Sequence, residues 1–321
     1  MTDFSKVSVI GCGRWGGFLG WYAATYKKSD VLFLGVPGDP AYESLIKTGN
    51  NGYCQMPENV SYTTDMEEVL KNDFIIVSIG CQAFRGLCKQ MSSYNLKGKK
   101  FLLAMKGLES DTGKRMTQIF AEEIPEQDIQ VAVLGGPGHP QDYLKGIPSC
   151  VVVSSASEEA KFAIADYMNS NLIRSYYGSD LIGNEVAAAL KNVVGVMAGI
   201  LDGMGWTSLK GALMARGPVE VGRIIEYFGG QAKTAYGLAH LGDYEATLFS
   251  PHSHNRAYGE AWAKGEKFEK LAEGVPTLKA VYALRDKLEI PLCTALYHVI
   301  YENSDAKKEI EILFQRPLKS E

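Results

Sequence analysis

The chain has 321 residues, of which 46% are hydrophobic and 22% charged, and its formal net charge is -4. This length suits two domains of ordinary size, and the composition matches a soluble globular protein. No block of basic residues is present that would suit nucleic acid, so a polyanionic partner is not expected.

Short apolar runs alternate with helical patterns through the first half of the chain. The runs that predict strands are Val7–Ile10, Val31–Leu34, Phe74–Ile79, Phe101–Met105, Val131–Leu134 and Val151–Val153. Such β-rich runs separated by helices are typical of a parallel, doubly wound (Rossmann) sheet in an α/β protein.

The pattern changes from about Asp180. Ile182–Met204 is long, apolar and rich in Ala and Gly, and no convincing strand follows it. A helix as apolar as Val186–Ile200 cannot lie on the surface, so we expect it to be the buried spine of an all-helical C-terminal domain. The predicted boundaries are residues 1–179 for a dinucleotide-binding domain and 180–321 for a helical substrate and catalytic domain.

A glycine-rich turn follows the first predicted strand. Gly11-Cys12-Gly13-Arg14-Trp15-Gly16 fits GxGxxG and opens an apolar helix near Trp15. In this arrangement a pyrophosphate lies on the helix N-terminus, where glycines let it approach the backbone. We therefore predict an NAD or NADP cofactor.

The residue that usually selects between the two cofactors is missing. The second strand ends Leu34-Gly35-Val36-Pro37, without an acidic group for the ribose 2′-hydroxyl, and Asp39 comes late for that role. No arginine stands there for a 2′-phosphate either. Both cofactors remain open at this point.

Two lysines suit the chemistry that hydride transfer to a ketone requires. Negative charge develops on the carbonyl oxygen, so a proton donor and a cation are needed beside it. Lys106 directly follows a predicted strand, where ligands bind in doubly wound folds. Lys191 lies in the apolar helix, where a charge must be paired or shift its pKa. The plausible carboxylate partner is Asp243.

Each of these residues also has an ordinary structural explanation. Lys106 could be an exposed loop lysine, Lys191 a snorkelling side chain at a domain boundary, and Asp243 a helix cap after a glycine.

Disulfides, metal binding and export are not expected. The six cysteines form no CxxC pair and read as reduced, mostly buried thiols. His252 and His254 have no third ligand nearby at metal-site spacing. No apolar run approaches the roughly 18 to 20 residues of a membrane span, and Met1–Lys6 lacks the order of a secretion signal. We expect a cytoplasmic protein.

The chain resembles the bacterial type of the NAD(P)-dependent sn-glycerol-3-phosphate dehydrogenase family over nearly its whole length. The motifs that carry the resemblance are Gly11–Gly16, Ile79–Arg85, Lys106–Glu109, Gly136-Pro137, Gly146–Pro148, Ala189–Asn192, Gly237–Ala239 with Gly242-Asp243, Asn255-Arg256, Glu273-Gly274 and Arg316–Glu321.

The resemblance implies reversible reduction of dihydroxyacetone phosphate to sn-glycerol 3-phosphate, for glycerophospholipid synthesis, by a homodimer. It implies that Lys191 is the general acid or base, that Lys106 polarises the carbonyl, and that Asp243, with Thr247 one turn on, orients Lys191. The implied substrate site comprises Lys106, Gly136, Gly138, Lys191, Asn192, Asp243, Ser253, His254 and Asn255. The implied cofactor site comprises Gly11, Gly13, Arg14, Trp15, Gly16, Val36, Gln82, Lys106, Pro140, His254, Leu271 and Glu273.

The chain departs from the family where the substrate phosphate is bound. His254 replaces an arginine, and an imidazole does not reproduce the bidentate fork of a guanidinium. Gly138 replaces a hydroxyl residue, with His139 beside it, and Val36 replaces an arginine that often marks NADPH use.

Three functions are compatible with these departures. The first is a glycerol-3-phosphate dehydrogenase in which Asn255, Arg256 and backbone amides still bind phosphate. The second is a dehydrogenase of the same fold that acts on a different phosphorylated or acidic hydroxy compound. The third is a non-catalytic nucleotide-sensing protein, against which the retained lysines and Asp243 argue.

Overall fold

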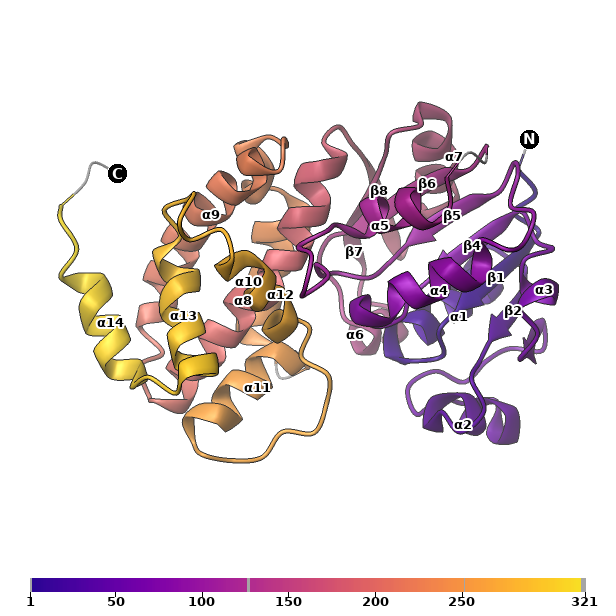
Figure 1. Cartoon of the computed structure of the whole chain (residues 1–321). Helices are drawn as coiled ribbons and strands as arrows, with labels where there is room; N and C mark the ends of the chain where they lie inside the picture. Colours follow the sequence, from indigo (N-terminus) through magenta and orange to yellow (C-terminus); the bar gives the residue numbers. More distant parts are fainter. Residues whose placement is uncertain (1, 126–127, 251, 319–321) are drawn as a thin grey trace. The chain divides into compact units, whose positions relative to one another are not determined.

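The chain divides into two units, which are described separately. The computed structural model describes residues 2–125, 128–250 and 252–318, without the side chains of residues 245 and 246. The first unit comprises residues 1–105 and 116–181, and the second comprises 106–115 and 182–321 (Figure 1). Residues 106–115 thus join the helical unit, although the sequence places them in the first domain. Lys319–Glu321, the end of the terminal motif, lie outside the described residues.

The first unit is built on one eight-stranded sheet. Its strands are β1 (Lys6–Ile10), β2 (Asp30–Leu34), β3 (Val60–Thr63), β4 (Phe74–Val77), β5 (Lys100–Leu103), β6 (Gln130–Gly135), β7 (Ser149–Ser155) and β8 (Ile173–Gly178). Their order is β3-β2-β1-β4-β5-β6-β7-β8. Every neighbouring pair is parallel except β6 and β7. The predicted α/β class with a Rossmann-type unit is confirmed.

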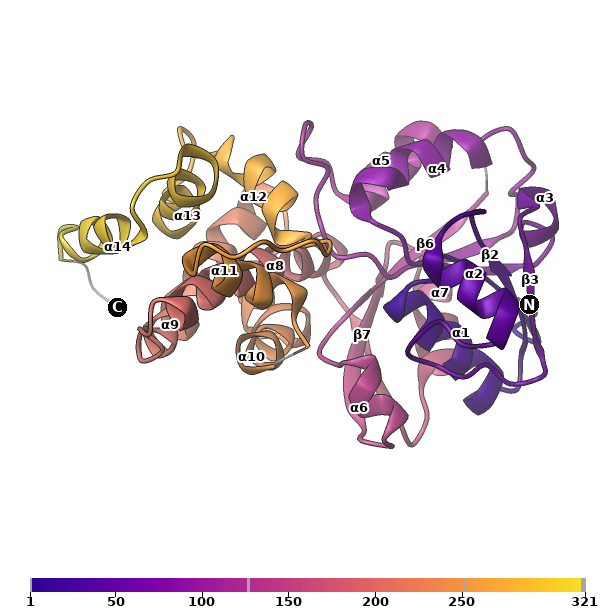
Figure 2. The ribbon, with the colours of Figure 1, turned by 90° about the horizontal axis from the view of Figure 1, so that it is seen from below.

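Helices cover both faces of this sheet (Figure 2). They are α1 (Arg14–Tyr26), α2 (Pro40–Thr48), α3 (Met66–Val69), the short 3-10 helix η1 (Cys81–Ala83), α4 (Phe84–Met91), α5 (Met116–Glu123), α6 (Pro140–Leu144) and α7 (Glu158–Met168). The central strands read as continuous Val, Ile and Leu runs because both of their faces are buried. The two edge strands, β3 and β8, are partly exposed and lack such a run, which is why the sequence did not predict them.

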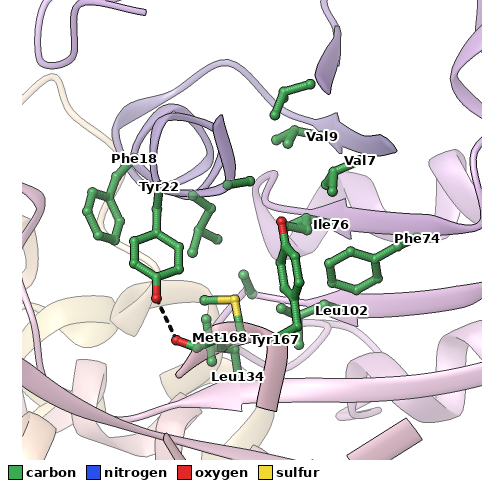
Figure 3. Packing of buried hydrophobic residues seen from close by; sticks show 14 of the residues in the cluster. Val7, Val9, Phe18, Tyr22, Phe74, Ile76, Leu102, Leu134, Tyr167 and Met168 are labelled. Carbon is green, nitrogen blue, oxygen red and sulfur yellow. Dashed lines mark hydrogen bonds between the residues drawn. The ribbon is translucent and has the colours of Figure 1, made fainter. Parts of the chain in front are cut away.

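Alternate strand residues pack into two separate cores. Val7 and Val9 belong to one core with Phe18 and Tyr22 of α1, whereas Ile75 belongs to the other with residues of α4 and α5. In the first core the Tyr22 hydroxyl donates to the Met168 carbonyl at 2.7 Å, which ties α1 to the end of α7 (Figure 3). This division fixes the strand register, because a slip of one residue would move the side chains of each core to the opposite face of the sheet.

The second unit is helical. It comprises α8 (Leu181–Gly203), α9 (Leu209–Tyr227), the 3-10 helix η2 (Ala232–Tyr236), the π-helical turn η3 (Leu238–Gly242), α10 (Asp243–Phe249), α11 (His254–Ala263), α12 (Gly274–Tyr282), α13 (Pro291–Glu302) and α14 (Ala306–Phe314). Among the described residues from 182 onward there is no strand, as predicted.

Helix α8 is the spine of this unit. By length and composition it could cross a membrane, but 83% of its most apolar window is buried inside the structure, as in the core helix of a soluble protein. Glycines let α11 approach it closely: a Cβ on Gly199 would collide with the Arg256 carbonyl, and one on Gly259 with the Val196 carbonyl. Backbone contact at these two points fixes α11 along α8.

Residues 106–115 are held on the helical unit by side-chain contacts. Arg115 forms an ion pair with Glu185 of α8, and Thr277 of α12 accepts a hydrogen bond from the Leu108 amide at 3.3 Å. These contacts place Lys106, the first residue of the segment, beside α8 and α10.

Candidate active site

The glycine turn after β1 has the geometry of a dinucleotide-binding loop. Gly11 has a φ of +114°, and a Cβ there would collide with the Ser78 carbonyl. A Cβ on Gly16 would collide with the Gly11 carbonyl, whereas the space around Gly13 is open. The first glycine thus makes the turn, the third lets the helix pack closely, and the second leaves the backbone accessible to a pyrophosphate.

Helix α1 begins next to Gly13, and no acidic side chain lies in its first turn. Gly13 is its N-cap, no side chain caps the first amides, and its first turn has no acidic residue. Amides left without a side-chain cap and the positive end of the helix dipole favour a bound phosphate. The residues present therefore fit an NAD or NADP pyrophosphate.

Asn51 supports this loop. Its role could not be predicted from the sequence, because it lies in a polar connecting segment. Its side-chain amide donates to the carbonyls of Cys12 and Gly13, each at 3.1 Å. Its oxygen accepts from the amides of Tyr53 and Cys54. By engaging two loop carbonyls, Asn51 fixes the orientation of the peptide units on which the pyrophosphate would rest.

The end of β2 carries no charge that would select between cofactors. Val36 is 68% exposed, and Asp39 is the N-cap of α2, where its carboxylate accepts from the Tyr42 amide at 2.9 Å. Asp39 is thus a helix cap, consistent with its late position in the sequence. Gln82 lies on η1 after β4, at the surface of the same unit.

The loop that follows β6 is shaped by glycines and by Tyr143. Gly136 and Gly138 have φ values of +112° and +147°, and a Cβ on Gly138 would collide with the Tyr143 ring. That ring stacks on Phe18 of α1 at 4.7 Å between centroids. His139 is the N-cap of α6, and Pro140 is its first residue. A side chain at position 138 would therefore meet the Tyr143 ring, and the positive φ there favours glycine.

A buried carboxylate joins the two predicted catalytic lysines in the helical unit. Lys106 Nζ donates to Asp243 Oδ2 at 2.5 Å, and Lys191 Nζ donates to Asp243 Oδ1 at 2.9 Å. Lys191 Nζ also donates to Thr247 Oγ1 at 3.2 Å, and that hydroxyl donates to the Asp243 carbonyl at 2.7 Å. The sequence paired Asp243 with Lys191 alone; the structure shows that it serves both lysines.

The charge of Asp243 is maintained by its partners. Burial raises the pKa of Asp243, but the two ammonium groups and their hydrogen bonds outweigh this and leave it below its ordinary value. The carboxylate therefore stays ionised near neutral pH. With Lys106 and Lys191 protonated, the group carries one net positive charge, which suits the stabilisation of an oxyanion.

His240 lies in the turn directly before Asp243, and no local pattern in the sequence indicates a role for it. It is fully buried in the π-helical turn that leads into Asp243, and its Nδ1 donates to the Ala187 carbonyl at 3.1 Å. Ala187 lies one turn before Lys191 on α8. Burial lowers the pKa of His240 to about 4, against smaller opposing effects from Ala187 and Asp243. The imidazole is therefore neutral at neutral pH and links the two elements through a hydrogen bond.

A series of amide hydrogen bonds holds the backbone of Lys106. Asn192 Nδ2 donates to the Lys106 carbonyl at 2.7 Å, and Asn255 Nδ2 donates to Asn192 Oδ1 at 2.9 Å. Asn255 Oδ1 accepts from the Gly274 amide at 2.9 Å. Asn192 and Asn255, which the resemblance places at the substrate, thus also fix the position of Lys106.

The other predicted residues of this unit lie at helix starts or on the surface. Ser253 caps α11, where its hydroxyl accepts from the Arg256 amide. His254 is the first residue of α11, Glu273 is the N-cap of α12, and Leu271 is 59% exposed.

Arg256 is engaged within the helical unit. Its Nη1 donates to Asp202 at 3.0 Å and to Glu260 at 2.8 Å, and its Nε donates to the Ser250 carbonyl. Asp202 also pairs with Lys210 and Glu260 also pairs with Lys264, so two carboxylates are shared by three cations. Among the residues that the structure describes, no group of three His, Cys, Asp or Glu side chains could hold a metal ion.

Comparison with known proteins points to one family. A model described as the N-terminus of NAD-dependent glycerol-3-phosphate dehydrogenase matches residues 6–161, and the corresponding C-terminus model matches residues 180–311. The glycerol-3-phosphate dehydrogenase (NAD(P)+) of Clostridium tetani is 36% identical over 83% of this chain and 79% of its own length. That of Clostridium botulinum strain Alaska E43 is 33% identical over 99% of both chains.

Solved structures agree in fold. The glycerol-3-phosphate dehydrogenase of Coxiella burnetii superposes with a TM-score of 0.89 at 25% identity, covering 98% of this chain and 100% of that one. The enzyme of Plasmodium falciparum gives a TM-score of 0.85 at 17% identity, covering 98% and 96%, and so supports the fold alone.

Replacing Asn51 by alanine should weaken dinucleotide binding. Two hydrogen bonds to loop carbonyls are lost, at roughly 1 kcal/mol each, so the Kd for NADH should rise by about tenfold or more. Titration of NADH fluorescence measures this. The matched control is Asn95→Ala, an exposed asparagine of the same unit whose side chain accepts from the Lys97 amide. Equal affinities for Asn51→Ala and the wild type would remove Asn51 from this role.

Replacing His240 by phenylalanine should flatten the dependence of stability on pH. The unfolded state binds a proton at this residue with a pKa near 6.5, and the folded state only near 4. Stability from neutral His240 is therefore full above pH 6.5 and is lost as pH falls toward 4, by about 3 kcal/mol. Urea unfolding at pH 7 and pH 4 should show a correspondingly smaller loss for the variant. The same loss in both proteins would contradict the assignment.

Proposed function

This chain belongs to the NAD-dependent glycerol-3-phosphate dehydrogenase family, and on that premise we propose that it interconverts dihydroxyacetone phosphate and sn-glycerol 3-phosphate. It is an NAD(P)-dependent oxidoreductase acting on a CH–OH group, and the product would supply the backbone of glycerophospholipids. The observation that carries the proposal is the shared carboxylate of Asp243 between Lys106 and Lys191. The comparisons favour neither of the two alternative functions.

The two lysines have different roles at the substrate oxygen. When bound, the nicotinamide supplies or accepts the hydride. In reduction, the Lys191 ammonium donates its proton to the carbonyl oxygen, and the Lys106 ammonium stabilises the charge that develops there. Asp243 stays ionised throughout and, with Thr247, orients Lys191. In oxidation, neutral Lys191 accepts the hydroxyl proton.

The proposed binding residues follow from the family motifs and the local geometry. For the cofactor they are Gly11, Gly13, Arg14, Trp15, Gly16, Val36, Gln82, Lys106, Pro140, His254, Leu271 and Glu273. For the substrate they are Lys106, Gly136, Gly138, Lys191, Asn192, Asp243, Ser253, His254 and Asn255. The phosphate would be bound by Asn255, Arg256 and backbone amides, since the two carboxylates that Arg256 contacts are shared with Lys210 and Lys264.

We further propose that the protein acts in the cytoplasm as a homodimer. Exposed aromatic side chains of the helical unit, Tyr236 and Phe249, are candidates for subunit contacts. Light scattering tests the dimer.

The activity is tested directly with purified protein. Dihydroxyacetone phosphate is mixed with NADH or NADPH while the absorbance of the reduced nicotinamide is followed. We expect oxidation of the nicotinamide with at least one of the two. No turnover with either would reject the proposed function, and turnover with a different ketone alone would transfer it to that substrate.

Replacing Lys191 by alanine should lower kcat by at least about a hundredfold, since a general acid contributes that much or more. The matched control is Lys210→Ala, because Lys210 is also a buried lysine of the helical unit that pairs with a carboxylate, Asp202. The control should keep kcat within about threefold. A near-normal rate in Lys191→Ala would show that another group moves the proton.

Replacing Val36 by arginine should shift cofactor preference toward NADPH. Val36 is exposed at the end of β2, so a guanidinium there would reach solvent without displacing the core and could pair with a 2′-phosphate. We expect the ratio of kcat/KM for NADPH to that for NADH to rise by about tenfold. Val36→Leu is the uncharged control, and an unchanged ratio in the arginine variant would remove this position from the cofactor site.

A further inference from the structure

His240 lies in a turn whose hydrogen bonding is not α-helical. Leu238–Gly242 form a π-helical turn, in which the Gly242 amide donates to the Gly237 carbonyl, five residues earlier, at 3.2 Å. Turns of this kind hold more residues than an α-helical turn and are frequent at functional sites. Asp243 is the next residue and the first of α10, which is labelled in Figure 1. The turn therefore leads directly into the carboxylate of the proposed active site.

The imidazole of His240 contacts the helix that carries Lys191 at one defined atom. Its Nδ1 lies 3.1 Å from the Ala187 carbonyl oxygen. A carbonyl oxygen only accepts, so Nδ1 donates and, in the neutral ring, Nε2 carries the lone pair. Ala187 and Lys191 are four residues apart in α8, the spacing at which a helical carbonyl accepts an amide. The ring of His240 is thus bonded to the helical turn that ends at Lys191.

The imidazole acts on this site through its geometry and not through a charge of its own. Burial lowers the pKa of His240 to about 4, against the opposing effects of the Ala187 hydrogen bond and the Asp243 carboxylate, and Lys191 adds to the lowering. The ring is therefore neutral at neutral pH. It can hold the two elements together without adding a cation beside the lysine.

Packing alone does not explain a histidine at this position. His240 is fully buried, and its ring stacks on that of Tyr244, with 5.4 Å between centroids. Its Nε2 has no hydrogen-bond partner within residues 2–125, 128–250 and 252–318. A buried nitrogen without a partner destabilises a fold relative to an apolar ring of similar size. The donor at Nδ1 is therefore the feature that a phenylalanine at this position would lack.

We infer that His240 is a positioning residue for proton transfer by Lys191. Its hydrogen bond to Ala187 holds this turn of α8 against the turn that leads into α10. It thereby fixes the 2.9 Å contact between Lys191 Nζ and Asp243 Oδ1. The inference rests on the proposed function, in which Lys191 donates the proton. Without the donor, α8 and the start of α10 would shift relative to each other, and a misplaced proton donor slows the reaction.

Two variants separate the donor from the ring. His240→Phe keeps a ring beside Tyr244 and has no donor, whereas His240→Asn loses the ring and keeps an N–H at the side-chain position of Nδ1. We expect kcat/KM for dihydroxyacetone phosphate to fall about tenfold in His240→Phe, and to stay within about threefold of the wild type in His240→Asn. Circular dichroism and thermal unfolding show whether each variant folds.

Tyr244→Phe is the matched control. It changes the ring stacked on His240 and removes a buried hydroxyl that, among the residues described, also has no hydrogen-bond partner. It should keep kcat/KM at the wild-type value, because Tyr244 makes no hydrogen bond between α8 and the turn. A loss equal to that of His240→Phe would show that packing at this point is what matters, and would overturn the inference.

The pH profile of kcat/KM gives a readout that a purely structural role would not move. A carboxylate in contact favours the protonated ammonium, so a loosened contact lets the Lys191 proton leave at lower pH. In His240→Phe we expect the alkaline limb of the reduction profile to move to lower pH by about 0.5 pH unit or more. In His240→Asn and Tyr244→Phe it should stay in place. An unmoved limb in His240→Phe, or an equal change in His240→Asn, would overturn the inference.

The tautomer of His240 tests the geometry without turnover. In nitrogen NMR of the full-length protein with isotope-labelled histidine, the His240 signal is the one missing from the variants. We expect the neutral Nδ1–H tautomer at neutral pH, and the Nε2–H tautomer or a protonated ring would overturn the inference. An inactive wild type with the Nδ1–H tautomer would reject the proposed function. An active wild type with the Nε2–H tautomer would reject the role of His240 alone.

Discussion

The charged centre of the helical unit depends on one buried carboxylate. Asp243 is 3% exposed, and transfer of such a group from water is costly unless it is paired and hydrogen-bonded. Lys106 and Lys191 each engage a different oxygen of it. The dependence is mutual, because Asp243 is the carboxylate that lies between the two partly buried ammonium groups.

Backbone packing positions this ion-pair network. Gly199 and Gly259 let α11 lie against α8, and Gly274 brings the start of α12 against the Asn192 carbonyl. The helices thus carry Asn192 and Asn255 into hydrogen-bonding distance, and Asn192 holds the backbone of Lys106. The neutral imidazole of His240 adds a contact between the turn before Asp243 and α8. Close helix packing and polar contacts therefore both position Lys106 and Asp243.

The dinucleotide loop differs from the Asp243 site, because it must present backbone amides to a bound pyrophosphate. The turn at Gly11 and the contact at Gly16 fix the backbone, whereas Gly13 leaves space beside the helix N-terminus. Asn51 engages the loop carbonyls and leaves the helix amides to the ligand. The same chain thus pairs the buried charge of Asp243 with two lysines and leaves the start of α1 without a side-chain cap.

The sequence alone determined the features that leave a local pattern. Strands buried on both faces read as apolar runs, GxGxxG follows the first of them, and α8 reads as one long apolar segment. Tertiary structure decided the rest. Asp243 lies 137 residues from Lys106 and 52 from Lys191. No repeating pattern in the sequence could therefore indicate that it pairs with both. Asn51, His240 and the edge strands β3 and β8 were likewise missed, because a side chain's partners and a strand's place at a sheet edge are set by contacts between distant segments.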